Sequence, residues 1–299
     1  MSGRSPCPEP PAPFVVGFGR SGNTLLRLML DSHPELAIPP ETDFIPPITI
    51  ACGLSFRPAD AFVATLVEHW RLRDLQVDAG RIERAVRRLR PFDLGEALRI
   101  VYRTYAAKFG KSRWGDKSPG YLPVMPLIAH VLPEARFVHV IRDGRDAWLS
   151  IRDLWFGPDT IEEAAESWQR WIVDARRAAK LLPSYAEVRF ERLVSDPEGT
   201  LRDLCAYLEL PWDDAMLRYY ERAPQRIAEV ITEASDGERV VASVAQRHRI
   251  HALTAQPPIA SRIGRWHREL PAEDVATFEA IAGETLAELG YELSNAVPN

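Results

Sequence analysis

The order of apolar and polar positions divides the chain into short strands that are each followed by a helix. Residues 14–18 are a continuous apolar run bounded by a proline and by glycines, which is typical of a short buried strand. A polar, glycine-bearing turn follows over residues 19–24. Apolar positions at helical spacing then predict a helix that ends before the His-Pro pair at 33–34, and residues 36–38 are a candidate second strand.

The same alternation returns in the second half of the chain. The pattern predicts a strand over 136–142, helices over 145–154 and 161–182, and a short strand over 187–190. Between the two halves, residues 58–110 have the apolar spacing of helices alone. Strands that alternate with helices indicate an α/β fold with a mostly parallel sheet covered by helices on both faces.

Two helix ends carry recognisable signals nearer the C-terminus. Ser195 and Glu198 have the S-x-x-E spacing of a capping box, which predicts the start of a helix. A later helix has apolar residues at helical spacing up to Leu289, and Gly290 stands at its C′ position.

No internal repeat and no linker divides the chain, so we expect one domain over residues 14–293. Residues 1–13 hold five prolines and no apolar segment, which predicts a disordered lead-in rather than a signal peptide or an anchor. Residues 294–299 are expected to be a tail.

Composition narrows the class of protein. Hydrophobic residues make up 46% of the 299, which is enough for a large core, and no apolar stretch approaches the length of a membrane span. The net charge of −5 argues against a nucleic-acid partner, which needs a basic face. The three cysteines lie far apart, so neither a disulfide framework nor a zinc site is predicted, and a reducing, cytoplasmic location is expected.

The turn over residues 17–24 has the composition of an anion site. It joins a strand to a helix, where free N–H groups and the positive end of the helix dipole favour a negative charge. Arg20 adds a permanent charge, and Ser21 and Thr24 add hydroxyl donors. The glycine spacing matches the P-loop of nucleotide triphosphatases, but Asn23 occupies the position of the P-loop lysine. The turn is therefore predicted to bind a phosphate group. A P-loop kinase or triphosphatase, and a βα turn without a ligand, are the alternatives.

A second candidate phosphate site follows the strand at 136–142. Arg142 ends this strand, at the sheet edge where α/β proteins bind ligands, and its planar guanidinium suits a phosphate. Ser150 lies eight residues further on, about two turns along the next helix. Two alternatives remain: Arg142 could belong to a surface network with Asp143, or Asp143 could hold magnesium as in nucleotide triphosphatases.

Together these segments resemble the sulfotransferases that use 3′-phosphoadenosine 5′-phosphosulfate (PAPS), with the tyrosylprotein sulfotransferases and their bacterial relatives as the most similar branch. The resemblance covers residues 14–44 and 114–293 and leaves 45–113 unmatched. It implies the sulfotransferase fold, a P-loop-like sheet flanked by helices, with 45–113 as a helical insertion. The segments that carry it are 19–26, 30–35, 40–42, 116–119, 142–145 with Ser150, 188–193, 208–212 and 264–266.

The resemblance also implies where the sulfonate donor binds. The first loop of the family binds the 5′-phosphosulfate, and an Arg-Ser pair binds the 3′-phosphate. Phe190 stands where many members have a tyrosine near the adenine, and Arg265 matches a basic residue of a closing C-terminal loop. No metal is implied, because the protein supplies the cations. The implied donor-binding residues are Arg20, Ser21, Gly22, Asn23, Thr24, Leu25, Arg142, Ser150, Phe190 and Arg265.

Two further matches imply the chemistry. Glu41 matches the catalytic base of the tyrosylprotein branch, and a positioned carboxylate can take the proton that an acceptor hydroxyl loses. Lys117 matches a lysine near the transferring sulfonate, where a cation stabilises the charge on the leaving phosphate. The implied activity is the transfer of sulfonate from PAPS to the hydroxyl of an acceptor.

The acceptor itself is not identified by the sequence. The unmatched residues 45–113 are expected to build the acceptor side, with Trp70 and Phe92 as candidate lining groups unless they belong to the core. Asp43 and Pro47 replace two arginines with which the tyrosylprotein branch reads acidic peptides. We therefore expect acidic tyrosine peptides to be poor acceptors and neutral or cationic compounds to be better ones.

Three features stay open at this point. His248 and His251 share a helical face, but no further ligand lies at a recognisable spacing, so a metal site is not predicted. Thr254 and Ser261 are candidates to complete the site from a C-terminal loop. The sequence leaves a homodimer open.

Overall fold

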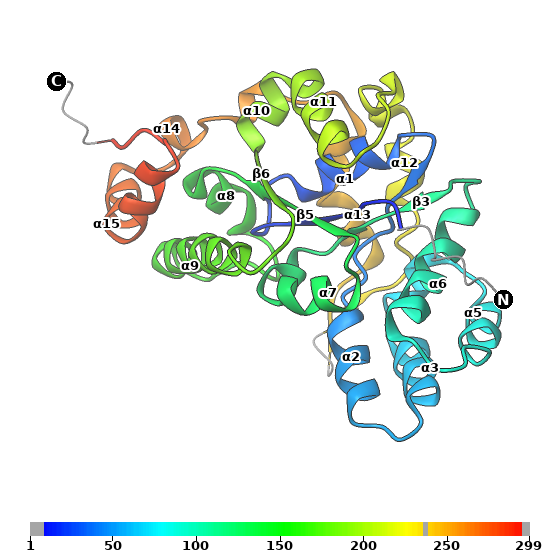
Figure 1. Cartoon of the computed structure of the whole chain (residues 1–299). Helices are drawn as coiled ribbons and strands as arrows, with labels where there is room; N and C mark the ends of the chain where they lie inside the picture. Colours follow the sequence, from blue (N-terminus) through cyan, green and yellow to red (C-terminus); the bar gives the residue numbers. More distant parts are fainter. Residues whose placement is uncertain (1–8, 236–238, 295–299) are drawn as a thin grey trace.

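The centre of the molecule is a parallel sheet with the strand order β4-β1-β5-β6 (Figure 1). The computed structural model describes residues 9–235 and 239–294. At the β4 edge the parallel pair β2 and β3 extends this arrangement, because only Gly115 separates β3 from β4. The predicted α/β fold with a mostly parallel sheet is confirmed. The strands are β1 (Ala12–Val16), β2 (Leu36–Ala37), β3 (Arg113–Trp114), β4 (Asp116–Lys117), β5 (Ala135–Ile141) and β6 (Tyr185–Arg189).

The first strand begins earlier than predicted. The Ala12 N–H donates to the carbonyl of Glu134 (3.0 Å), and Pro13 lies in register with β5, so the lead-in cannot extend to residue 13. A proline fits in this strand because the residue next to it is Gly115, which has no side chain. A Cβ on Gly115 would lie 2.7 Å from Pro13. Residues 1–8 lie outside the described residues.

Alternating side chains of β1 are buried in two separate cores. Phe14 and Val16 point to one face of the sheet and Val15 to the other. The helices on the Val15 face are α1 (Asn23–Asp31), α10 (Phe190–Ser195), α11 (Pro197–Tyr207) and α12 (Ala223–Ile227). Apart from the helices of residues 45–113, four helices cover the other face and the end of the sheet. They are α7 (Met125–Val131), α8 (Gly144–Ile151), α9 (Ile161–Ala179) and α15 (Ala272–Glu288).

Residues 45–113 form a helical lobe beside the sheet (Figure 1). Its apolar faces meet the Phe14 core, where the ring of Tyr102 stacks on that of Trp114 with centroids 4.7 Å apart. Phe92 packs against Phe62 in this core, so it is not a group that lines a site. The helices of the lobe are α2 (Ile45–Gly53), α3 (Pro58–Glu68), α4 (Leu72–Leu75), α5 (Ala79–Val86) and α6 (Leu94–Ala107).

The two predicted helix ends had different outcomes. The capping prediction at Ser195 is wrong, because Ser195 is the last residue of α10. The Asp196 side chain instead accepts a hydrogen bond from the Gly199 N–H (3.0 Å) at the start of α11. The helix end at Gly290 is confirmed, with a φ of 74° that glycine adopts without a steric penalty.

The C-terminal segment returns to the sheet and covers its carboxyl edge. Its elements before α15 are β7 (Ala234–Ser235), β8 (Val240–Ala242), α13 (Val244–Arg249) and α14 (Trp266–Glu269). The Ser294 N–H donates to the carboxylate of Glu279 (3.0 Å), so the tail starts later than predicted, and residues 295–299 lie outside the described residues.

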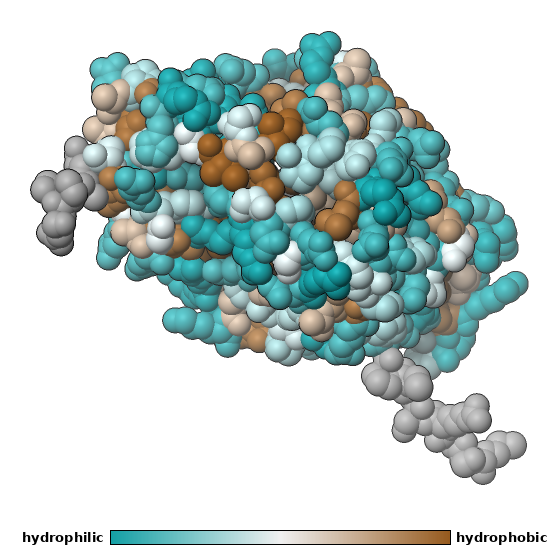
Figure 2. Space-filling model, turned by 90° about the horizontal axis from the view of Figure 1, so that it is seen from above, coloured by the Kyte–Doolittle hydropathy of each residue, from teal (hydrophilic) through white to brown (hydrophobic). Residues whose placement is uncertain are grey.

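On the face of the molecule that Figure 2 presents, hydrophobic residues do not form a continuous belt. That face is mostly hydrophilic, and its hydrophobic residues lie in small separate areas (Figure 2). Within the part of the chain that the structure describes, no helix combines the length and the apolar character needed to cross a membrane.

Candidate active site

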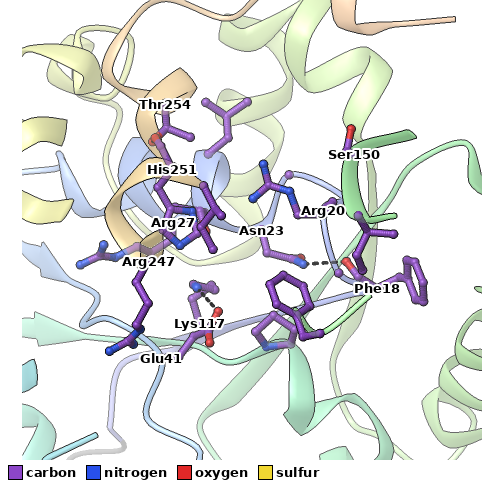
Figure 3. A pocket seen from close by; sticks show the side chains of 18 of the residues that line it. Phe18, Arg20, Asn23, Arg27, Glu41, Lys117, Ser150, Arg247, His251 and Thr254 are labelled. Carbon is purple, nitrogen blue, oxygen red and sulfur yellow. Dashed lines mark hydrogen bonds and ion pairs between the residues drawn. The ribbon is translucent and has the colours of Figure 1, made fainter. Parts of the chain in front are cut away.

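A cavity of about 1190 Å³ opens at the carboxyl edge of β1, β4 and β5 (Figure 3). The turn after β1, the ends of β4 and β5, and the C-terminal segment all contribute to its wall. This is the sheet edge where α/β proteins bind ligands, because strand ends and helix starts leave polar backbone groups there.

The turn between β1 and α1 is shaped by two glycines. Gly17 has a φ of 148°, and a Cβ on it would lie 2.4 Å from the Val140 carbonyl oxygen. Gly22 has a φ of 102°, and a Cβ on it would lie 2.6 Å from the Phe190 ring. The first N–H groups of the following helix have no partner inside that helix, as in any α-helix. Here the cavity is lined by Gly22, Asn23, Thr24 and Leu25.

Asn23 has a different role from the one predicted. Its side-chain amide donates to the carbonyls of Gly17 (3.2 Å) and Phe18 (3.0 Å), so it closes the turn (Figure 3). The amide nitrogen is therefore already used, and only the backbone N–H of Asn23 is available to a donor molecule. At the position that a lysine occupies in the P-loop, this chain therefore has Asn23, whose side chain hydrogen-bonds to the turn itself.

Three side-chain donors beside this turn lack a protein partner. Arg20 Nε, Ser21 Oγ and Arg142 Nε are buried and have no hydrogen-bond partner among the described residues. Burial, and then the neighbouring Arg142 and Arg262, lower the pKa of Arg20 to about 10. Burial also lowers the pKa of Arg142, although Asp146 opposes this effect. Buried donors are normally paired, so these atoms and charges fit a bound anion.

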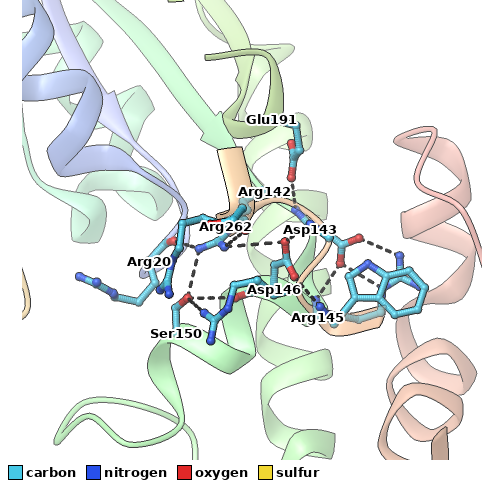
Figure 4. Close-up of polar contacts among 12 residues, drawn as sticks. Arg20, Arg142, Asp143, Arg145, Asp146, Ser150, Glu191 and Arg262 are labelled. Atoms are coloured by element: carbon cyan, nitrogen blue, oxygen red, sulfur yellow. Dashed lines mark hydrogen bonds and ion pairs between the residues drawn. The ribbon is translucent and has the colours of Figure 1, made fainter. Parts of the chain in front are cut away.

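Arg142, which precedes α8, meets Ser150 in the last turn of that helix, eight residues further along the chain. Arg142 Nη1 donates to Ser150 Oγ (3.2 Å) and to the carbonyl of Arg20 (3.1 Å) (Figure 4). The Arg142 guanidinium also lies 4.4 Å from the centroid of the Phe190 ring. The structure thus brings four of the predicted donor-binding residues together.

A C-terminal loop closes over the same place. Arg142 Nη2 donates to the carbonyl of Arg262 (2.8 Å). The Asp146 carboxylate accepts hydrogen bonds from the N–H groups of Gly264 (2.8 Å) and Trp266 (2.9 Å), so α8 holds the loop in position. Arg262 lines the cavity, and the sequence interpretation missed it.

Arg265 does not line the cavity itself but lies beside Ser150, which does. Its guanidinium pairs with Glu269 (Nε to Oε1, 2.9 Å) and comes only within 3.4 Å of Ser150 Oγ. Arg262 and Arg265 are three residues apart in one loop, and both lie next to the Arg142–Ser150 pair. The donor-binding role of Arg265 stays a prediction.

Glu41 and Lys117 form a close pair at the floor of the cavity. Lys117 Nζ donates to Glu41 Oε1 (2.6 Å), and Arg71 Nη1 lies 3.0 Å from Glu41 Oε2 (Figure 3 shows the first pair). Burial opposes ionisation of the carboxyl, but the two cations outweigh it and hold the pKa of Glu41 well below its ordinary value. Glu41 is therefore an ionised carboxylate at neutral pH.

A buried network behind this pair fixes its geometry. Thr42 Oγ1 donates to Asp116 Oδ2 (2.6 Å), and the Tyr102 hydroxyl donates to the same oxygen (2.9 Å). Thr42 follows Glu41 in the chain and Asp116 precedes Lys117, so this contact sets the distance between the two functional side chains. Burial raises the pKa of Asp116 to about 6.

Comparison with known proteins identifies the family. A family model described as "Sulfotransferase family" matches residues 11–214, which is more than half of the chain. The chain belongs to the sulfotransferase family.

Individual sulfotransferases agree with this assignment. A protein-tyrosine sulfotransferase from Danio rerio is 27% identical over 97% of this chain and 74% of its own length. The structure of the sulfotransferase domain of the Synechococcus PCC 7002 olefin synthase has a TM-score of 0.58 at 22% identity, over 96% of this chain and 98% of that one. Mouse sulfotransferase SULT7A1, solved in complex with PAP, has a TM-score of 0.51 at 11% identity, over 93% and 85%. The two structural likenesses show the sulfotransferase fold.

The rest of the sulfotransferase cavity is built by residues that the sequence interpretation missed or left open. His251 lines the cavity, and its Nδ1 is buried without a partner in the described chain. Burial, then Lys117 and Arg20, hold the pKa of His251 well below its ordinary value, so the ring is neutral. Thr254 lines the cavity and Ser261 does not.

His248 and His251 do not come together as ligands in the described part of the chain. His248 Nε2 is hydrogen-bonded to the carbonyl of Val230 (2.7 Å), so it does not join His251 in binding a metal ion. Among residues 9–235 and 239–294, no group of three or more potential metal ligands is present. His139, which is fully buried, binds the Tyr185 hydroxyl (2.6 Å) and belongs to the core.

Proposed function

We propose that this sulfotransferase moves sulfonate from PAPS to a hydroxyl of its acceptor. One observation carries the proposal: Arg20 and Arg142, whose buried Nε atoms are unpaired among the described residues, line the same cavity as the Glu41–Lys117 pair. The first group suits a phosphorylated donor, and the second suits proton removal and charge stabilisation next to it.

The donor half of the cavity fits PAPS. Arg20 and Ser21, with the first N–H groups of α1, would hold the 5′-phosphosulfate. Arg142 and Ser150 would hold the 3′-phosphate, and the Phe190 ring would lie beside the adenine. The mouse sulfotransferase of the same fold was solved with PAP, which supports this ligand class.

The catalytic pair fits an in-line transfer to an alcohol or phenol. Glu41 takes the proton of the acceptor hydroxyl as the acceptor oxygen bonds to sulfur. The bond from sulfur to the bridging phosphate oxygen breaks, and adenosine 3′,5′-bisphosphate leaves. Lys117 stabilises the charge that builds on that leaving oxygen. Because Lys117 Nζ binds Glu41 Oε1, it must turn away from Glu41 for both residues to act.

The ion pair of Asp43 removes the basis of our expectation that acidic peptides are poor acceptors. Asp43 is not an isolated negative charge, because its Oδ2 lies 2.8 Å from Arg71 Nε. Glu41, Asp43, Lys117 and Arg71 together carry two negative and two positive charges. We therefore propose an acceptor that is a hydroxyl compound of either charge, and a protein tyrosine is one candidate because the relative from Danio rerio is named for that substrate.

Two measurements test the proposed function. Calorimetry should show tight, magnesium-independent binding of adenosine 3′,5′-bisphosphate and weaker binding of adenosine 5′-phosphate. Incubation with PAPS labelled in sulfur and a panel of alcohols and phenols should yield a labelled acceptor. Magnesium-dependent binding of ATP with no response to the bisphosphate would overturn the proposal in favour of a P-loop kinase or triphosphatase.

A further inference from the structure

Arg71 reaches the proposed base from the helical insertion, which the family resemblance did not cover. It lies between α3 and α4, thirty residues after Glu41 in the chain. Its Nη1 lies 3.0 Å from Glu41 Oε2, and its Nε lies 2.8 Å from Asp43 Oδ2. The Arg71 side chain is only 16% exposed, so both ion pairs are largely shielded from water.

The Arg71 guanidinium is itself supported by an aromatic ring. It lies 4.4 Å from the centroid of Trp70, which lines the cavity. Arg247 lies over the same ring at 4.9 Å. Asp74 in turn pairs with Arg247 (2.9 Å) and is fully buried. The insertion and the C-terminal segment therefore hold Arg71 in one place.

Glu41 uses its two oxygens for two different cations. Lys117 binds Oε1 and Arg71 binds Oε2. When Lys117 turns to the donor, Oε1 becomes free to accept a proton while Oε2 is still held. A bond from a planar guanidinium that is fixed at its other edge keeps the carboxylate from rotating.

We infer that Arg71 is a positioning residue for Glu41, and that Asp43 holds Arg71 for this task. The inference rests on the proposed function, because it concerns the base of that reaction. Asp43 then belongs to the support of the base rather than to a filter against acidic acceptors. The charged and titratable groups that face Glu41 from the surrounding elements are Arg20, Asp43, Arg71, Lys117 and His251.

The test compares Arg71→Met with Arg71→Lys, and uses Arg73→Met as a matched control because Arg73 is an exposed arginine on α4. In Arg71→Met we expect kcat to fall tenfold to hundredfold, as for a charge-assisted hydrogen bond. Affinity for adenosine 3′,5′-bisphosphate should stay within about twofold. The acid limb of the kcat–pH profile should move to higher pH, because Glu41 loses a cation that lowers its pKa. Arg71→Lys should recover part of kcat and reverse part of the shift.

Different failures of this test lead to different conclusions. A fall in kcat with an unmoved acid limb would reduce Arg71 to a structural residue and overturn the inference. A parallel loss of bisphosphate affinity would place Arg71 in the donor site and overturn it as well. Glu41→Gln separates the inference from the proposed function. If Glu41→Gln keeps normal turnover, the base itself is wrong. If Glu41→Gln is inactive and Arg71→Met behaves as wild type, only the inference fails.

Discussion

The donor half and the acceptor half of the cavity are built in different ways. Arg20, Ser21 and the start of α1 are neighbours in sequence, and Arg142 and Ser150 lie eight residues apart on one strand–helix unit. Glu41, Lys117, Arg71 and His251 instead come from four segments that meet only in the folded chain. The donor half is therefore set by local backbone geometry, and the acceptor half by long-range packing.

This difference has a consequence for how each half can change. A phosphate held by helix N–H groups and strand-end arginines needs the backbone of two βα units, and few side-chain substitutions can replace it. The acceptor half depends on ion pairs between side chains from separate elements, such as Arg71 with Asp43. We expect the two halves to respond separately to mutation.

The largest expected effect is on turnover through the acceptor half. Glu41→Gln keeps the shape of the side chain but cannot accept a proton at neutral pH. We expect kcat to fall by roughly 10²–10⁴, as for loss of a general base, while calorimetric affinity for adenosine 3′,5′-bisphosphate changes less than about threefold. Glu68→Gln, at an exposed position of α3, is the matched control. A large loss of bisphosphate affinity in Glu41→Gln would show that the two halves are not separate.

The next effect concerns the buried network that supports the pair. The pKa of Asp116 is raised to about 6 by burial, from an ordinary value near 4, so the native state binds a proton more readily than the unfolded state. Its ionisation therefore costs stability above pH 6, by up to about 3 kcal/mol, and the cost disappears as the pH falls to about 4.

Asp116→Asn removes this titration. We compare the free energy of unfolding of Asp116→Asn with that of the wild type. We expect the difference, variant minus wild type, to be most positive at pH 7. Urea titrations should show this difference falling by roughly 2–3 kcal/mol toward pH 4. Asp153→Asn, at an exposed position after α8, should show no such trend. A difference that stays constant from pH 7 to 4 would mean that Asp116 titrates normally.

The donor half should show the opposite split from Glu41→Gln. Arg142→Ala removes a cation from the proposed 3′-phosphate site, so affinity for adenosine 3′,5′-bisphosphate should fall about tenfold to hundredfold. Affinity for adenosine 5′-phosphate should change far less, because it lacks the 3′-phosphate. Calorimetry on both ligands, with Arg152→Ala as an exposed control, checks this. Equal losses for the two ligands would remove Arg142 from that site.

The smallest effect expected is that of acceptor charge. Because Glu41 and Asp43 are both paired with cations, a tyrosine peptide flanked by aspartates and its neutral counterpart should differ in kcat/KM by less than about threefold at low salt. Labelled PAPS with each peptide measures this. An acidic peptide that is tenfold slower would restore Asp43 as a repulsive group, and one that is tenfold faster would show that an arginine of the cavity reads acidic side chains.

The misses of the sequence interpretation share a physical cause. We predicted that the Asn23 side chain contacts the sulfonate donor, but its amide donates hydrogen bonds to two carbonyls of the β1–α1 turn. Arg262 was not considered, although the path of one short loop brings it to the cavity beside Arg142. His251 was weighed only as a metal ligand, because the charged side chains that act on it, Arg20, Glu41 and Lys117, lie more than a hundred residues away in sequence.

By itself, the sequence determined the α/β fold, the turn of the donor site, and the Arg142–Ser150 pair. These features follow from periodicity, from glycines in strained turns and from the fixed geometry of a strand followed by a helix, all of which act over a few residues. Glu41 and Lys117 were also identified, but only through resemblance to a family. Only the tertiary structure decided that Arg71 and His251 join them. Contacts between side chains of distant segments depend on how whole layers pack, and no local pattern in the chain encodes that packing.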